Sequence, residues 1–232
     1  MTDIQIDENF RRDRLLEAQR HAAALFAAVG ESDIVRPGVR ESEASEAIRE
    51  LGATEFGLPE HWHKRIVRSG PNTLTTYADD PPDRTITDDD IVYVDFGPLF
   101  EHWEADFGRT FVIGTDPHKL RLRDDLATIF AAGKRYYAEH PDVTGAEMYA
   151  EFIRLVGERG WQPGNVYAGH LVGEHPHENF GGDKLESYVI AGNHQPMRRT
   201  DPHGRIGHWI LEVHLVDRER QIGGFFEELL SL

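Results

Sequence analysis

Apolar residues recur at helical spacing in four parts of the chain. One stripe covers residues from about 10 to 29, and a shorter one covers residues 44–51. In the second half, one amphipathic segment follows Asp116, which precedes a proline, and another follows Thr144, which opens a capping box. The pattern therefore predicts two helices in each half of the chain.

Stretches with strand-like alternation separate these helices. A short stretch covers residues 73–77, and two longer runs contain Asp95 and Asp106. Residues 208–216 form the clearest strand, since one face is wholly apolar and the other carries polar side chains. A short strand is expected at residues 225–230. The alternation of helices with strand pairs predicts an α/β protein.

A weak internal repeat relates the two halves. Residues 37–51 and residues 141–155 share the spacing from a proline to a glutamate, and each leads into an amphipathic helix. The offset between them is 104 residues, close to half of the chain. Such a repeat predicts two similar halves and a site between them that takes ligands from both.

Composition excludes several classes of protein. The 232 residues suffice for one large domain or two small ones, and the net charge of -16 argues against nucleic acid or an anionic membrane as partner. No apolar run is long enough to cross a bilayer, and no secretion signal is visible. The absence of cysteine excludes disulfides and thiolate chemistry, and it fits a cytoplasmic protein.

Asp95 and Asp106 are the strongest chemical signal in the chain. They lie eleven residues apart in apolar, strand-like runs. Two inward carboxylates in such a hairpin are costly unless a cation lies between them, because an unpaired buried charge is unfavourable. The pair therefore indicates a metal site.

Three further candidate ligands lie in the second half. Glu212 shares a strand face with two histidines, and only one of Glu227 and Glu228 can reach the same site. His170 begins a segment with three histidines in eight residues, and the glycines around it suggest a backbone brought close to a ligand. Four carboxylates and one imidazole suit two divalent ions of manganese, iron, cobalt or zinc.

His61 and His63 would share a face if their segment is a strand. One interpretation of this spacing is a metal-binding pair. The preferred interpretation is that both are packing or surface histidines.

The order Asp, Asp, His, Glu, Glu resembles the pita-bread metallopeptidases, namely methionine aminopeptidase, aminopeptidase P and prolidase, with creatinase as a metal-free relative. The sequence Asp-Phe-Gly-Arg-Thr-Phe after the second aspartate is close to the family's usual continuation. The resemblance covers nearly the whole chain from about residue 10. The residues that match the family's metal ligands are Asp95, Asp106, His170, Glu212 and Glu227.

The resemblance implies an α/β (α+β) pita-bread fold, in which a curved, mainly antiparallel sheet is built from two pseudo-symmetric halves. Helices are expected on its outer side and the site on its concave side. Residues 1–232 are expected to form a single catalytic domain without the amino-terminal domain of prolidases and creatinases. The expected partners are a peptide or small amide substrate, with a homodimer left open.

The implied function is a dinuclear metal-dependent hydrolase, an Xaa-Pro-type aminopeptidase or dipeptidase that uses a hydroxide held between two divalent ions. Manganese is the first choice, with cobalt, iron or zinc as alternatives. Glu212 would be both ligand and proton acceptor, and His177 would steady the oxyanion. The Ser-Gly-Pro-Asn turn at residues 69–72 favours Xaa-Pro chemistry over methionine removal.

Two positions depart from the family pattern. Tyr77 stands where the family has a histidine, and Val213-His214 replaces the Pro-Gly that usually follows the strand glutamate. Tyr77, His177 and His214 are expected to contact the substrate. Two alternatives stay open: a metal-dependent enzyme that acts on a small amide or guanidino compound, and an inactive binding protein with the same fold.

Overall fold

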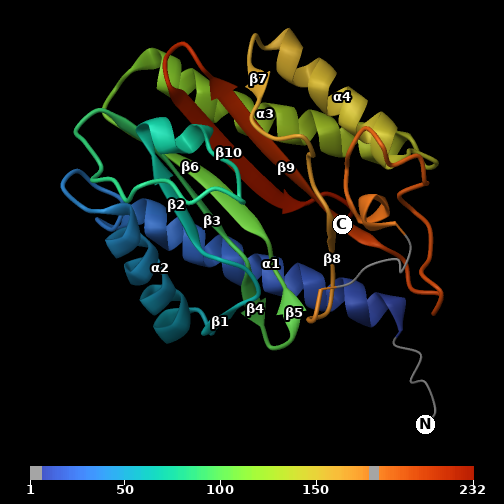
Figure 1. The fold of residues 1–232 in the computed structure, drawn as a ribbon. Coiled ribbons are helices and arrows are strands. Elements are labelled where there is room, and N and C mark those ends of the chain that lie inside the picture. The colour runs from blue at the N-terminus through green and yellow to red at the C-terminus, as the bar shows by residue number, and fades with distance from the viewer. Residues whose placement is uncertain (1–6, 178–182) are drawn as a thin grey trace.

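The computed structural model describes residues 7–177 and 183–232. Within these residues the four predicted helices are present, each slightly longer than its apolar stripe, together with two short 3-10 helices (Figure 1). The α-helices are α1 (Glu8–Glu31), α2 (Glu41–Glu55), α3 (Pro117–Glu139) and α4 (Gly145–Glu158), and the 3-10 helices are η1 (Gly70–Leu74) and η2 (Lys184–Ser187). None of the helices in this described part combines the length and apolarity that a membrane span requires.

The strands form one large antiparallel sheet and one small one. The large sheet has the order β2-β3-β6-β10-β9-β7, with β8 paired to β9, and the small sheet has the order β1-β4-β5. The strands are β1 (Glu60–His61), β2 (Ile66–Ser69), β3 (Asp90–Phe96), β4 (Pro98–Phe100), β5 (Trp103–Glu104), β6 (Phe107–Ile113), β7 (Gln162–Pro163), β8 (Leu171–Val172), β9 (His208–Asp217) and β10 (Ile222–Leu229).

The large sheet has its midpoint between β6 and β10, which divides it into two halves of similar build. The first half carries α1 and α2, and the second carries α3 and α4 (Figure 1). Helix α2 begins at residue 41 and α4 at residue 145, which is the same offset as in the sequence repeat. The repeat therefore marks equivalent helices of two structural halves.

Local capping accounts for where the second pair of helices begins. The Asp116 carboxylate accepts the backbone N–H groups of His118 and Lys119, and a proline occupies the first turn. Thr144 and Glu147 form the reciprocal capping box that the sequence predicts. Both predicted helix starts are confirmed.

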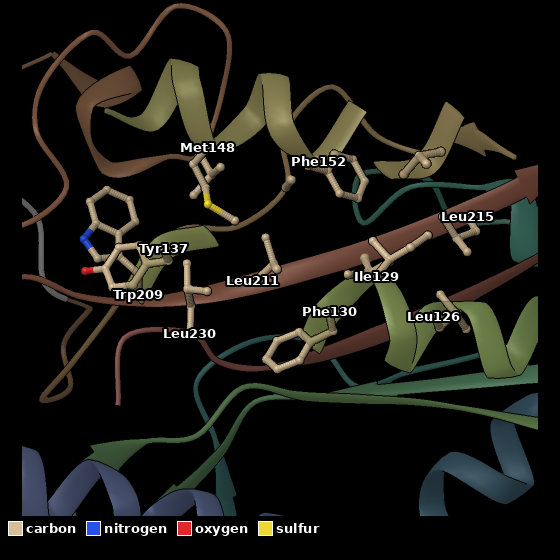
Figure 2. Close-up of a cluster of buried hydrophobic side chains, with 14 of the residues drawn as sticks. Leu126, Ile129, Phe130, Tyr137, Met148, Phe152, Trp209, Leu211, Leu215 and Leu230 are labelled. Atoms are coloured by element: carbon tan, nitrogen blue, oxygen red, sulfur yellow. The ribbon is translucent and has the colours of Figure 1, made fainter. Parts of the chain in front are cut away.

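One hydrophobic core lies between α3, α4 and the sheet (Figure 2). Leu211 and Leu215 of β9 pack in it with Phe152 of α4 and Ile129 of α3, all nearly inaccessible to solvent. Burying each such side chain stabilises the fold by about 1.5–3 kcal/mol. The predicted apolar face of residues 208–216 is therefore the face that the helices cover.

A second core lies between α1, α2 and the other half of the sheet. Val94 and Phe96 of β3 pack against α1, where Phe26 meets the Phe96 ring edge-on at 6.3 Å. Because side chains alternate along a strand, Tyr93 and Asp95 point away from the helices. Both halves of the sheet thus carry helices on one face and leave the other face for polar groups.

The predicted strand at residues 73–77 is wrong. The chain forms η1 there and then turns. Pro71 has no N–H for a ladder, and Asn72 donates its side-chain amide to the buried Glu41 carboxylate at 2.9 Å. These bonds hold the segment in a tight turn, so its β-branched residues do not pair with a strand.

Candidate metal centre

One row of paired residues crosses the four neighbouring strands β3, β6, β10 and β9, which lie side by side in Figure 1. Asp95 of β3 is paired with Gly108 of β6, and Gly108 is paired with Glu227 of β10. Glu227 is paired in turn with Glu212 of β9. Directly paired residues share a face, so the antiparallel register gathers three carboxylates, with a glycine between the first two.

Asp106 and His170 join this row from outside the regular strands. Asp106 lies two residues before Gly108 and therefore on the same side. His170 precedes β8 and is tied to β9, because its carbonyl accepts the N–H of Ile210 at 3.0 Å. The Nε2 of His170 lies 3.3 Å from Asp106 Oδ2 and 3.8 Å from Glu212 Oε1.

His63 also lies in this cluster, whereas the sequence favoured a packing or surface position for it. Its Nε2 lies 3.1 Å from Asp106 Oδ1 and 3.7 Å from Asp95 Oδ1. Strand β1 ends at His61, and the chain then turns inward. The register of β2, in which Ile66 opposes Asp95, brings His63 to the cluster, because His63 lies only three residues before Ile66. This pairing is a tertiary feature that the local sequence pattern does not show.

The carboxyl groups of the cluster have strongly shifted pKa values. Burial, together with the neighbouring carboxylates, raises the pKa of Asp95 to about 7 and that of Glu212 to about 8. The same causes raise the pKa of Glu227. Burial also raises the pKa of Asp106, but His63 and His170 outweigh it and hold this pKa well below its usual range.

The two imidazoles shift in the opposite sense to most buried histidines. Burial lowers their pKa values, but the Asp106 carboxylate outweighs it and raises the pKa of His63 and of His170 to about 9. Apart from Asp106, the carboxyl groups and the imidazoles of the cluster therefore both favour their protonated forms. Such crowding of carboxylates favours a cation between them.

The donor atoms fit a pair of divalent ions. Within each of two groups of residues, all donor atoms lie within 4.8 Å of one another. One group is His63, Asp95 and Asp106, and the other is Asp106, His170 and Glu227. Asp95 is buried, yet its Oδ1 has no hydrogen-bond partner among the described residues. A buried carboxylate oxygen without a partner is costly, and a cation shared with Asp106 would satisfy it.

His177 lies beside this cluster and is held by a glutamate that the sequence reasoning missed. Its Nδ1 lies 3.0 Å from Glu104 Oε2, and the same oxygen accepts the N–H of Gly173 at 3.1 Å. The His177 ring stacks on Trp62 at 4.8 Å. Glu104 lies two residues before Asp106, so in an extended segment the two side chains share a side, and this spacing is the signal that would have indicated a second inward carboxylate.

Tyr77 and His214 both line the pocket above the cluster, but in different ways. Tyr77 is 44% exposed, and its ring lies 5.8 Å from that of His63. His214 is buried, and its Nε2–H donates to the carbonyl of Thr73 at 2.8 Å. The Nε2 of His214 is therefore engaged within the protein.

Burial lowers the pKa of His214 from 6.5 to about 4. The unfolded chain then binds the extra proton more readily than the folded one. The contribution of His214 to the free energy of unfolding is complete above pH 6.5 and is lost as the pH falls towards 4, by about 3 kcal/mol in total.

We expect urea unfolding of His214→Gln to show a correspondingly weaker dependence of stability on pH. His203→Gln, at an exposed position, is expected to keep the wild-type dependence. Equal pH dependence in all three proteins would contradict this.

The chain matches the family profile described as Metallopeptidase family M24 over residues 13–203. It is 25% identical over 179 residues to an Xaa-Pro dipeptidase of Pyrococcus horikoshii, which is 76% of this chain and 49% of that protein. It is 27% identical over 157 residues to an Xaa-Pro dipeptidase of Pyrococcus furiosus, which is 67% of this chain and 43% of that protein. The chain thus spans about half the length of the curated relatives it matches.

Solved structures show the same architecture. A prolidase from Thermococcus sibiricus superposes with a TM-score of 0.73 at 20% identity, over 96% of this chain and 56% of that one. An X-Pro aminopeptidase from Thermotoga maritima also gives 0.73, at 18% identity, over 97% of this chain and 62% of that one. The predicted pita-bread fold is therefore confirmed.

Proposed function

Because the chain belongs to metallopeptidase family M24, we propose that it is a metal-dependent hydrolase that cleaves the bond between an amino-terminal residue and a following proline. The observation that carries this proposal is the position of Asp106. Its two carboxylate oxygens face two different imidazoles, at 3.1 Å and 3.3 Å, as expected of a ligand that bridges two ions. The Xaa-Pro dipeptidases among the relatives support the substrate class.

We propose that two divalent ions bind to Asp95, Asp106, His170, Glu212 and Glu227. Manganese is the preferred ion. When bound, such ions lower the pKa of a water molecule and polarise the scissile carbonyl. Glu212 lies at the end of the row and 3.8 Å from His170. As a proposed ligand it would lie beside the water that the ions hold, within reach of the water proton. We assign it the transfer of the water proton towards the leaving nitrogen.

His177 is proposed to donate a hydrogen bond to the substrate carbonyl oxygen. Since its Nδ1 faces the Glu104 carboxylate, which only accepts, Nδ1 carries a proton that points away from the pocket. Stacking on Trp62 fixes the ring plane. In the imidazolium form both ring nitrogens carry a proton, so Nε2–H can donate to the substrate oxygen and stabilise negative charge on it while Nδ1–H stays on Glu104.

Glu104→Gln tests this arrangement. The substitution weakens the hold on His177, so we expect kcat to fall about 10–100-fold with little change in KM, since the lost interaction acts in the transition state. The measurement is steady-state kinetics on an Xaa-Pro peptide. In a His177→Phe background the same change is expected to cost little more, because both substitutions remove one interaction. An equal further loss in that background would contradict the role of Glu104 as a positioning residue.

The pocket favours peptides longer than two residues. Its walls include the aromatic side chains of Trp62, Tyr93, Tyr167 and Phe225, and none of its described lining residues is lysine or arginine. The free carboxylate of a dipeptide would therefore find no lysine or arginine partner among the described lining residues, and the ions are assigned to the scissile carbonyl. The absence of such a partner supports an aminopeptidase more than a dipeptidase.

A substrate panel tests the proposal with manganese-loaded protein. It compares Xaa-Pro dipeptides, tripeptides with proline at the second position, peptides that begin with methionine, and small amide and guanidino compounds. Hydrolysis of the proline tripeptides is the expected result. Failure of all peptides in protein with bound metal would overturn the proposal. Turnover of small amides alone would then favour the second candidate, which rests on Tyr77 in place of the family's histidine.

A further inference from the structure

His63 lies outside the five ligands proposed above, yet it contacts the same carboxylates. Its side chain is 7% exposed, and its Nε2 is the nitrogen nearest to both Asp95 and Asp106 among the described ion pairs. Donor atoms about 2.1 Å from one ion lie about 3–3.5 Å from one another. The distances of 3.1 Å and 3.7 Å from Nε2 to the two carboxylates are close to this separation.

The orientation of the His63 ring is set in the same way as that of His170. The Nδ1 of His63 lies 2.7 Å from the carbonyl of Lys64, and the Nδ1 of His170 lies 2.6 Å from the carbonyl of Leu171. A carbonyl only accepts, so both Nδ1 atoms carry a proton. Both Nε2 atoms then face the carboxylates, and this backbone support is typical of metal-binding histidines.

The backbone around His63 is shaped to admit the ring. Trp62 donates its N–H to the carbonyl of Gly97 at 2.9 Å and its indole N–H to the carbonyl of Ala105 at 3.1 Å. A Cβ on Gly97 would lie 2.1 Å from Cδ2 of His63, which no side chain tolerates. His63 is therefore held against the cluster by specific contacts on both sides.

We propose that His63 is a sixth metal ligand, which binds through Nε2 the ion held by Asp95 and Asp106. This inference rests on the proposed metal-dependent function. In this arrangement each ion has one imidazole ligand. His63 lies on one side of Asp106 and His170 lies on the other. It also gives the buried Oδ1 of Asp95, which lacks a hydrogen-bond partner among the described residues, a shared ion.

The second imidazole has a consequence for metal preference. Carboxylate ligands suit manganese, whereas imidazole increases the preference for zinc, cobalt and nickel. The site that contains Asp95 and His63 is therefore expected to prefer zinc over manganese more strongly than a site made of carboxylates alone.

X-ray absorption spectroscopy of the zinc-loaded protein counts the imidazoles directly. We expect about one imidazole per ion in the wild type and half that number in His63→Phe. Titration with zinc and with manganese is expected to show that His63→Phe weakens zinc binding at one of two sites by at least about tenfold, and manganese binding by less.

His61→Phe is the matched control. His61 lies two residues away, packs edge-on against Phe96 at 5.4 Å, and makes none of the described ion pairs. Its substitution is expected to change neither the imidazole count nor the affinities. If the wild type shows only one imidazole for two ions, the proposed role of His63 is overturned and the metal-dependent function stands. A wild type that binds no divalent ion would overturn the metal-dependent function itself, so the two failures are distinguishable.

Discussion

Asp106→Ala is expected to lower the metal content from about two ions per chain to less than one, and to lower kcat/KM on an Xaa-Pro peptide by at least about 10³-fold. Asp106 is the residue shared by the two groups of clustered donor atoms. Its loss is therefore expected to affect both ions, whereas His63, Asp95, His170 and Glu227 each belong to only one of the two groups, and Glu212 belongs to neither. Removing several kcal/mol of electrostatic stabilisation accounts for a rate loss of this size.

Elemental analysis after dialysis, together with steady-state kinetics, measures this effect. Asp125→Asn is the matched control, because Asp125 is also a buried aspartate but is bound to Arg159 at 2.6 Å and to the Trp161 indole at 2.8 Å. We expect the control to lose stability and to keep its metal. Asp106→Ala protein that retains two ions, or both variants losing metal equally, would contradict the bridging position.

Gly169→Ala is expected to lower the free energy of unfolding by about 3 kcal/mol or more. Gly169 has φ of +140°, and a Cβ there would lie 2.2 Å from the carbonyl oxygen of Ile210. An alanine must therefore adopt a strained conformation and push the segment away from β9. Because His170 follows directly, weaker metal binding is expected as well.

Thermal unfolding measures this prediction, with an expected fall in Tm of about 6–12 °C. Gly157→Ala is the control, since Gly157 lies in α4 and a Cβ there meets nothing within 4 Å. The control is expected to leave stability unchanged or to raise it by up to about 1 kcal/mol. Similar Tm values for both variants would show that the close approach to Ile210 is unimportant.

The glycines around His170 illustrate how a correct signal can have a different cause. Their density suggested a backbone close to a ligand. At Gly169 the close approach is instead to strand β9, whose Ile210 carbonyl leaves no space for a Cβ. The sequence identifies a position that needs glycine, but the neighbour that requires it is forty-one residues away.

The sequence by itself determined those features that depend on residues close together in the chain. The period of two along residues 208–216 separates the apolar face from the face that carries Glu212, and the same period separates Glu227 from Glu228. Capping at Asp116 and Thr144 depends on side chains within one turn. Each of these features follows from local geometry that every strand or helix shares.

Only the tertiary structure decided which distant segments meet. His63 and Glu104 enter the site because β2 pairs with β3 and because Glu104 binds the segment after His170. Residues 73–77, predicted as a strand, instead complete a 3-10 helix and turn, because the preceding Asn72 bonds to Glu41 on α2. Strand register and long-range hydrogen bonds set these positions, and neither is encoded in the pattern of a single segment.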